Sequence, residues 1–457
     1  MANSLVQIAI IVLLGVATVV AQQEGTLQQV SGAARISTGS SGALTFEQAV
    51  QLALENNLST LLTRERRNEA RGEKQQSLSA LLPNVSGGAS QANITENLVA
   101  MGFQPGFLPG LNSVLIGPFK NFDARVRLSQ TIFDFSAIQN YRAAAAGVRV
   151  AELREALARE QVVNAAGLVY IEALRADRAV AAAQANVELA QALLKLAQDQ
   201  RSAGVATGVD VTRALTRLAE HQVTLVEAQT ASEQARLNLQ RVVGLPLGSP
   251  LVLTEQLQLN EMPLPAVEVA VAQAQQDRRE IQVFEAQTRV SELERKAARA
   301  EYLPSLEVVG NYGSSGSTPN ILDLPTRTIA VQLNVPIFNG GLTRGRVTAA
   351  TSRLRQSELE LSNIRNEVEE DVRVALTTLR SAGAQVRAAN ESVRLAQREL
   401  EMARDRFRAG VGDNLEVVSA QTSLAQATQQ QVTALAQHNA ARLNLATALG
   451  RAEAFRW

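Results

Sequence analysis

The same pattern of residues occurs twice along this chain. The sequence Ala-Arg-Leu-Asn-Leu at Ala235–Leu239 returns at Ala441–Leu445, at an offset of 206 residues. Nearer the N-terminus, Leu82-Pro83 returns as Leu303-Pro304 at an offset of 221 residues. A repeat of this length that covers most of a chain indicates two copies of one structural unit. We therefore expect one duplicated protomer rather than the roughly three unrelated domains that the length alone would suggest.

The duplication and the N-terminal composition divide the chain into six segments. Residues 5–20 are almost entirely apolar and end at Val19-Val20-Ala21, which is typical of a cleaved signal peptide. A membrane anchor is the competing interpretation, but a run of about 16 apolar residues is short for a spanning helix. The predicted segments are a signal peptide at 1–21, a flexible segment at 22–43, repeat one at 44–245, a linker at 246–263, repeat two at 264–450 and a tail at 451–457.

Long helical hairpins are predicted for the second part of each copy. All 12 prolines lie outside the windows 119–245 and 337–457, and these windows are rich in strong helix formers. Apolar residues recur there every seven residues in two stripes, one of them mostly alanine, as in a coiled-coil seam. Each window breaks once, at Gly204–Gly208 and at Gly410–Asn414. The pattern predicts two antiparallel hairpins, and the first outgoing arm, at 135–202, would span on the order of 100 Å.

A helix and two strands are predicted to precede each hairpin. The first helix begins at Thr45, where Gln48 can complete a capping box, and runs towards Leu82. Apolar and polar residues then alternate, which is typical of strands with one buried or lipid-facing side. Gly/Pro/Asn-rich stretches between the strands predict hairpin loops. The four predicted strands lie near 85–94, 122–133, 305–313 and 327–338.

The alternation separates two sets of strand residues. A polar face and an apolar face suit a sheet that lies between a water-filled lumen and lipid. The alternative is a soluble sheet whose aromatic side chains form its core. Four strands do not close a membrane barrel, since the smallest have about eight, so chains would have to pool their strands. The predicted lumen-facing residues are Arg125, Arg127, Gln332 and Asn334, and the predicted lipid-facing residues are Val126, Leu128, Val331 and Leu333.

Composition argues against several classes of function. The 44 Lys and Arg are balanced by 44 Asp and Glu, so the chain has no basic excess for binding nucleic acid. It has no Cys, which excludes disulfides and thiolate metal sites. His221 and His438 are predicted to be packed or solvated helix residues rather than metal ligands. Because no nucleophile–base arrangement, metal-spaced cluster or phosphate loop is evident, we expect neither an enzyme nor a cofactor.

Several segments together resemble the TolC-like outer-membrane factor family, over about residues 44–450. The resemblance implies a fold that is mainly α with a small β part, in a homotrimer. Its four strands per chain would form a twelve-stranded outer-membrane barrel that continues into the periplasm as an α-helical tunnel. It also implies an exit duct for an efflux or type I secretion system, with an inner-membrane pump and a periplasmic adaptor as partners. The matching segments are LTFEQAVQLALENN at Leu44–Asn57, the two Leu-Pro helix ends, VPIFNGG at Val335–Gly341, RFRAGVGDNLEVVSAQ at Arg406–Gln421 and Ala448–Gly450.

The resemblance places the hairpin turns at the periplasmic entrance, where the adaptor docks. Acidic residues near the turns, repeated around a trimer axis, would repel one another and attract cations, and so form an entrance gate. The alternative is that Asp210 and Glu416 only stabilise the first turn of the returning helix, where an acidic side chain interacts favourably with the helix dipole. The family's second constricting acid corresponds to Ser419, so any acidic gate is depleted here. The predicted docking residues are Gly204, Val205, Gly208, Gly410, Val411 and Gly412, and the candidate gate residues are Asp210, Asp413 and Glu416.

An exported coiled-coil scaffold or adaptor without a pore remains the alternative function. Adaptors also use helical hairpins, but they carry small lipoyl-like and barrel domains, for which no second set of strands is evident. The transported substrate is not specified by the sequence.

Overall fold

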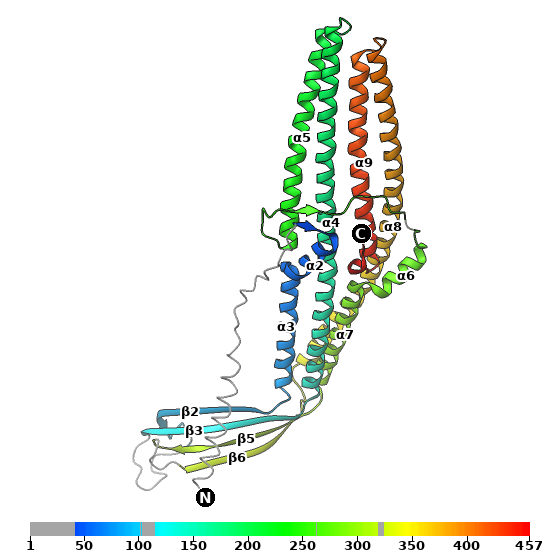
Figure 1. Cartoon of the computed structure of the whole chain (residues 1–457). Coiled ribbons are helices and arrows are strands. Elements are labelled where there is room, and N and C mark those ends of the chain that lie inside the picture. Colours follow the sequence, from blue (N-terminus) through cyan, green and yellow to red (C-terminus); the bar gives the residue numbers. More distant parts are fainter. Residues whose placement is uncertain (1–41, 101, 103–114, 262, 319–323) are drawn as a thin grey trace, which may run out of the picture. The chain divides into compact units, whose positions relative to one another are not determined.

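The computed structural model describes residues 42–100, 102, 115–261, 263–318 and 324–457 (Figure 1). The chain divides into two units, one of residues 1–43 and 250–252 and one of residues 44–249 and 253–457. The predicted signal peptide, and the predicted flexible segment up to residue 41, lie outside the described residues. Two short strands, β1 (Ala43–Leu44) and β4 (Val252–Leu253), form a two-stranded sheet.

The two predicted copies have the same order of elements. Copy one contains α2 (Phe46–Asn56), α3 (Leu58–Ser79), β2 (Asn84–Asn97), β3 (Leu115–Phe133), α4 (Phe135–Ser202) and α5 (Gly208–Val243). Copy two contains α6 (Val267–Asp277), α7 (Arg279–Ala300), β5 (Ser305–Gly316), β6 (Leu324–Asn334), α8 (Leu342–Arg408) and α9 (Asn414–Ala448). A 3-10 helix at Ala452–Ala454 lies in the predicted tail.

The two helical hairpins lie side by side in the second unit (Figure 1). α4 packs along α5, α8 packs along α9, and α4 also contacts α9, so that α5 and α8 are the outer helices of the four. The predicted apolar stripes are buried in these contacts. Val372, Leu379, Val386 and Leu400 of one stripe are all less than 9% exposed, and the alanine stripe of α8 is buried from Ala375 to Ala403. The predicted bounds of the first outgoing arm, 135–202, agree with α4.

The first predicted helix of each copy is broken, which corrects the prediction of one helix from Thr45 to Leu82. Thr45 and Gln48 do form the capping box, but the helix ends at Asn56 and α3 starts after Asn57. The Asn57 side chain accepts a hydrogen bond from Ser59 N at 2.9 Å and donates one to the Val242 carbonyl of α5 at 3.3 Å. The side chain thus caps the new helix and anchors it to the end of the hairpin.

Copy two breaks at the equivalent residue, Arg278. Its guanidinium donates to the Ala448 carbonyl at the end of α9 at 3.3 Å and pairs with Asp371 of α8 at 3.0 Å. Glycines allow the close approach at both breaks, because a Cβ on Gly244 would lie 2.5 Å from Asn56 Cβ and one on Gly450 would lie 2.9 Å from the Asp277 carbonyl carbon. The break is therefore a feature of the repeat.

The four long strands form one antiparallel sheet in the order β2-β3-β5-β6. β3 of copy one pairs with β5 of copy two, so each copy contributes one β-hairpin and the copies meet in the middle of the sheet. β2 and β6 are the outer strands of the described sheet. Among the described residues, no helix combines the length and the apolar character needed to span a membrane.

Candidate functional site

Strand register assigns the predicted strand residues to two opposite faces. Side chains of directly opposed residues in antiparallel strands lie on the same face. Leu128 opposes Gly310, which opposes Ile329, so the β3 and β6 apolar sets share a face. Arg127 opposes Asn311, which opposes Thr328, so Arg125 and Arg127 share the other face with Gln332 and Asn334. The predicted division into two sets is thus a property of the sheet, while the medium that each face meets stays a prediction.

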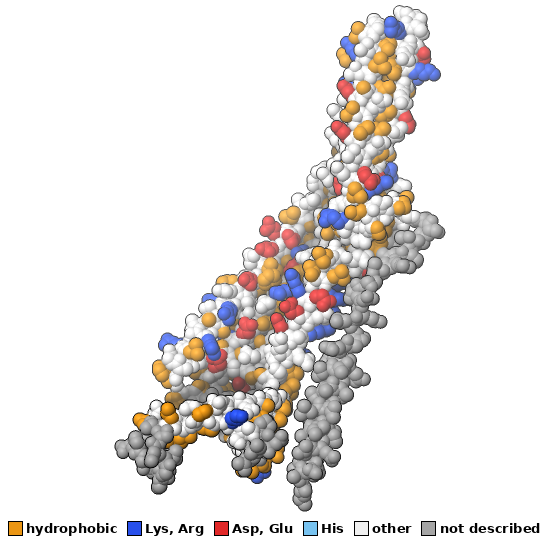
Figure 2. All heavy atoms as spheres, turned by 90° about the vertical axis from the view of Figure 1, so that its left-hand side faces the viewer, with side chains coloured by type: hydrophobic (Ala, Val, Ile, Leu, Met, Phe, Trp, Pro, Cys, Tyr) orange, Lys and Arg blue, Asp and Glu red, His pale blue; other side chains and the backbone are white. Residues whose placement is uncertain are grey.

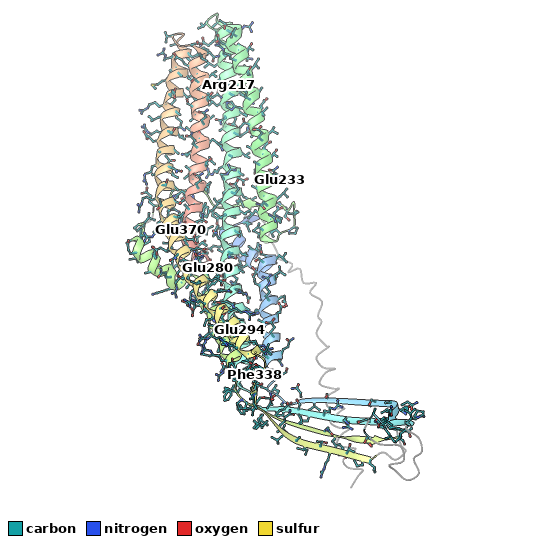
Figure 3. The ribbon with its side chains drawn as sticks, turned by 180° about the vertical axis from the view of Figure 1, so that it is seen from behind. Arg217, Glu233, Glu280, Glu294, Phe338 and Glu370 are labelled. Atoms are coloured by element: carbon teal, nitrogen blue, oxygen red, sulfur yellow. The ribbon has the colours of Figure 1, made fainter. Side chains whose placement is uncertain are left out.

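The apolar face is exposed in the single chain. Val126, Leu128, Tyr312, Ile329, Val331 and Leu333 are between 40% and 79% exposed. Further exposed apolar side chains lie where the sheet joins the helices, and Ile337 and Phe338 are 94% and 87% exposed (Figure 3). The space-filling view shows hydrophobic side chains gathered at this end, whereas on the helical part hydrophobic side chains are interspersed with charges of both signs (Figure 2). A contiguous apolar surface of this kind indicates contact with lipid or protein.

The opposite face of the sheet carries charge. Arg125 and Asp123 form an ion pair, and Arg127, Asn311, Glu307, Gln332 and Asn334 belong to the same face. Gly313 opposes Arg125 across the β3–β5 pair, and a Cβ on Gly313 would lie 2.4 Å from Arg125 Cβ. A residue without a side chain is therefore required opposite this arginine.

The two hairpin turns lie next to each other at the far end of the helices. Gly204 and Gly410 adopt positive φ angles of 76° and 71°, the left-handed conformation that favours glycine. A Cβ on Gly410 would lie 3.5 Å from Val205 Cγ1, so the predicted docking residues of the two turns meet. Val205 and Val411 are 55% and 70% exposed.

The remaining predicted docking residues close the turns onto the helices. Gly208 is the first residue of α5. A Cβ on Gly412 would lie 2.9 Å from Arg406 Cβ and 3.2 Å from the Arg406 carbonyl carbon, so a larger residue would push the second turn away from α8. The backbone N–H groups of Val411 and Gly412 both donate to the Arg406 carbonyl at 3.1 Å.

Asp210 caps the start of α5. Its carboxylate accepts hydrogen bonds from Thr207 N at 2.8 Å and from Thr207 Oγ1 at 2.6 Å. These bonds hold the pKa of Asp210 below its usual value, because they favour the charged form. The geometry supports the capping interpretation for Asp210.

The acidic residues of the second turn are engaged differently. Asp413 caps α9 by accepting from Leu415 N at 3.1 Å. Glu416 points to α8, where Arg406 Nε lies 3.3 Å from its carboxylate, and both side chains are about half exposed. Glu416 is therefore more accessible than Asp210, and its role in a gate stays a prediction.

Polar and apolar contacts join the two turns. The Asn414 side chain donates to the Asp210 carbonyl at 3.0 Å, and Asn414 itself is buried. Below the turns, Leu193 of α4 packs with Phe407 of α8 and Val417 of α9 in one apolar cluster. The turns are thus fixed relative to each other within the chain.

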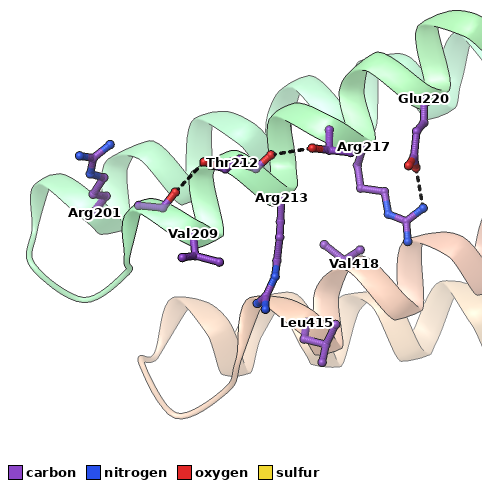
Figure 4. A pocket seen from close by; sticks show the side chains of 10 residues that line it. Arg201, Val209, Thr212, Arg213, Arg217, Glu220, Leu415 and Val418 are labelled. Atoms are coloured by element: carbon purple, nitrogen blue, oxygen red, sulfur yellow. Dashed lines mark hydrogen bonds and ion pairs between the residues drawn. The ribbon is translucent and has the colours of Figure 1, made fainter.

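A groove between α5 and α9 begins at the turns (Figure 4). We call it the tip groove. Val209 and Leu415, both more than half exposed, and Val418 supply its apolar lining. The sequence prediction did not include its cationic residues, Arg201, Arg213 and Arg217, of which Arg217 pairs with Glu220 at 2.6 Å.

A comparison of the repeats would have revealed two of these arginines. At the offset of 206 residues, Arg213 and Arg217 correspond to Ser419 and Ser423. Two cations are therefore specific to copy one.

Comparisons with known proteins agree with this geometry. The model of the outer membrane efflux protein family matches residues 49–245 and 270–451. The chain is 25% identical over 311 residues to the alkaline protease secretion protein AprF of Pseudomonas aeruginosa, covering 67% of this chain and 65% of that protein. It is 27% identical over 340 residues to the pyoverdine export outer membrane protein OpmQ of Pseudomonas putida, covering 72% and 70%.

The fold is shared with solved structures. The Campylobacter jejuni CmeC outer membrane channel superimposes with a TM-score of 0.76 at 19% identity, over 89% of this chain and 86% of that one. The outer-membrane channel OprN superimposes with a TM-score of 0.77 at 18% identity, over 89% of both chains. At these identities the likeness establishes the fold.

Proposed function

The chain belongs to the outer membrane efflux protein family, and we propose that it is the outer-membrane exit duct of an efflux or type I secretion system. In this role it lies in the bacterial outer membrane and extends into the periplasm. It is a passive conduit for substrates that an inner-membrane pump delivers. Its family and relatives are duct proteins rather than enzymes, so selectivity comes from partners and from the shape and charge of the duct.

The two-faced sheet is the observation that carries the proposal. Lipid offers no hydrogen bonds, so the free edges of β2 and β6 have to pair with other strands within a membrane. Four strands from each of three chains close one barrel with the exposed apolar face outward and the charged face around water. Arg125, Arg127, Gln332 and Asn334 then line the lumen.

The helices support the same homotrimer. α5 and α8 are the outer helices of the four and carry exposed apolar side chains. Contact between α5 of one chain and α8 of the next would cover them and close a tunnel. The residues concerned are Leu215, Val223 and Val226 of α5 and Leu359, Val374 and Leu395 of α8, all at least 48% exposed.

The two turns are the docking surface for a periplasmic adaptor. Exposed Val205 and Val411 lie beside the tip groove, which offers an apolar lining within reach of three arginines. A helical hairpin with apolar and acidic side chains would complement that surface. We assign the turns to the periplasmic entrance because they lie at the opposite end of the hairpins from the sheet.

A pair of neighbouring substitutions tests the proposal. Val331→Lys places a charge on the lipid face, where it costs about 2–4 kcal/mol near the bilayer midplane. Gln332→Lys, one residue away, places the same charge on the lumen face. We expect Val331→Lys to prevent trimer insertion, and Gln332→Lys to form channels in planar bilayers with altered ion selectivity.

The alternative, an exported scaffold without a pore, predicts a different result. Both variants and the parent would then remain soluble without detergent and would not conduct ions. That outcome, or equal effects of the two lysines on insertion, would overturn the exit-duct proposal.

A further inference from the structure

A carboxylate joins α4 to α5 towards the end of the first hairpin that lies away from its turn. Asp177 accepts hydrogen bonds from Arg236 Nη2, which lies 3.1 Å from each carboxylate oxygen, and from Ser232 Oγ at 2.7 Å. Ser232 is buried, and Asp177 and Arg236 are partly buried, with side chains 27% and 38% exposed. The negative charge compensates an arginine at a helix–helix contact.

The second hairpin keeps the arginine and lacks the carboxylate. At the offset of 206 residues, Arg442 corresponds to Arg236, His438 to Ser232 and Gly383 to Asp177. Arg442 is 8% exposed and His438 is 4% exposed, so this contact is more deeply buried than its counterpart in copy one.

Two polar atoms at this contact have no partner among the described residues, namely Arg442 Nε and His438 Nδ1. Arg442 donates to the neutral side chain of Asn439 at 3.3 Å and lies over the Phe455 ring, and it forms no ion pair with a described residue. A buried arginine without a nearby negative charge is unfavourable, because removing an ion from water costs several kcal/mol.

Gly383 lies beside His438 and leaves room for a side chain. A Cβ at this position would lie 4.0 Å from His438 Nδ1 and 3.9 Å from Arg387 Nη1, which is ordinary van der Waals contact. A side chain would therefore fit. The chain nevertheless has glycine here, at a cost of about 1 kcal/mol relative to alanine inside a helix. The position of this Cβ adjoins the unpartnered imidazole nitrogen of His438 and the guanidinium of Arg387.

We infer that Gly383, His438 and Arg442 form a binding site for a small inorganic anion, chloride, which takes the place that the Asp177 carboxylate has in copy one. A single-atom anion suits this position, because copy two lacks only the side chain of one aspartate there and because His438 and Arg442 are buried. Arg387, which pairs with Glu261 at 2.7 Å, adds positive charge at the edge of the site.

Binding would take up a proton on His438. Nε2 of His438 lies 3.3 Å from the Asn260 carbonyl, which only accepts hydrogen bonds, so Nε2 carries the hydrogen. Nδ1 can then donate to an anion only when the imidazole is protonated. Burial and the charge of Arg442 and Arg387 lower the pKa of His438, while Glu261 and the Asn260 carbonyl raise it. A bound anion would oppose that lowering, so affinity should increase as the pH falls.

Thermal unfolding of the full chain in detergent tests the inference. At pH 6 and constant ionic strength, replacing gluconate by chloride should raise the unfolding midpoint by about 2 °C or more, and by less at pH 8. Gly383→Asp supplies the carboxylate within the chain and should remove the chloride dependence. Gly383→Ala, which changes helix propensity without adding charge, is the matched control.

Copy one provides the converse test. Asp177→Gly combined with Ser232→His, which gives copy one the residues of copy two, should create a chloride dependence that the parent lacks at this site. Bromide-soaked crystals of the parent give a second measurement, with an anomalous peak expected within hydrogen-bonding distance of His438 Nδ1. Equal chloride dependence in the parent and in Gly383→Asp, or no bromide at this position, would overturn the inference whether or not the chain conducts ions.

Discussion

In copy one a fully buried position of α4 holds Tyr170, whereas the equivalent position of α8 in copy two holds Leu376. The Tyr170 hydroxyl donates to the Leu44 carbonyl at 2.9 Å and contacts the carboxylate of Glu255 in the linker. Leu376 instead packs in an apolar cluster with residues of α6, α7 and α9. At equivalent positions, copy one thus buries a polar side chain that contacts the linker, and copy two buries an apolar side chain.

Aromatic contacts reinforce the core of copy one. Phe46 packs edge-on against Tyr170 at 5.7 Å between ring centroids, and Phe455 and Trp457 of the tail pack on Phe46 at 5.4 and 5.7 Å. The Trp457 indole donates to the Gln256 carbonyl of the linker at 3.2 Å. The two copies therefore share the frame of helices and breaks, while copy one uses its buried positions for contacts with the linker and the tail.

Truncating the two buried side chains should produce the largest effects. Tyr170→Ala should destabilise the protein by about 3–5 kcal/mol and Leu376→Ala by about 2–5 kcal/mol, because each leaves a cavity. Tyr170→Phe removes only the hydroxyl and should still cost about 0.5–1.5 kcal/mol, the net contribution of a hydrogen bond, because Glu255 keeps Phe46 N and Thr254 Oγ1 as donors. Denaturant titration measures these changes, and a neutral Tyr170→Phe would contradict the polar character assigned to the first core.

A buried acid of copy one should make stability depend on pH. Burial raises the pKa of Glu160 to about 7, although Arg279 lies 3.4 Å away and opposes the shift. An acid whose folded pKa is raised destabilises the fold as the pH rises above its unfolded value, because the folded state must then hold a buried charge. The equivalent residue of copy two, Asn366, is exposed and uncharged.

Glu160→Gln should therefore remove a loss of about 1–3 kcal/mol between pH 5 and pH 8. Denaturant titrations of parent and variant at both pH values measure the change. The control is Asn366→Asp, which should leave the pH profile unchanged because the position is exposed. Parallel pH profiles for the parent and Glu160→Gln would show that Glu160 does not carry the buried charge.

Much of the frame was predictable from residue patterns that act locally. Heptad spacing and the absence of proline predicted α4 to its bounds, and alternation predicted which strand residues share a face. The helix breaks were missed because Asn57 and Arg278 act through Val242 and Ala448, which are distant in sequence. The aromatic contacts of Trp457 and the tip groove were also missed because they join residues that are distant in sequence. Arg213 and Arg217, which copy two lacks, could have indicated the groove.

Removing the helix caps at the turns should have a smaller, local effect. Asp210→Ala and Asp413→Ala each remove an acceptor for backbone N–H groups, at a cost of about 1 kcal/mol. Hydrogen exchange should accelerate at the start of α5 in the first variant and at the start of α9 in the second. Equal acceleration at both turns in either variant would instead indicate that the Asn414–Asp210 contact couples them.

Substituting Glu416 should have the smallest effect on stability, but it tests the predicted entrance gate directly. Its ion pair with Arg406 is half exposed, and such pairs contribute about 0–1 kcal/mol. If three copies of Glu416 form an acidic ring at the entrance, Glu416→Gln should change single-channel conductance and its dependence on cations. Asp210→Asn is the matched control in copy one, because that carboxylate is already committed to Thr207. Unchanged conductance in Glu416→Gln would contradict the gate and would indicate that Glu416 only stabilises the first turn of α9. The two turns would then differ in capping chemistry alone.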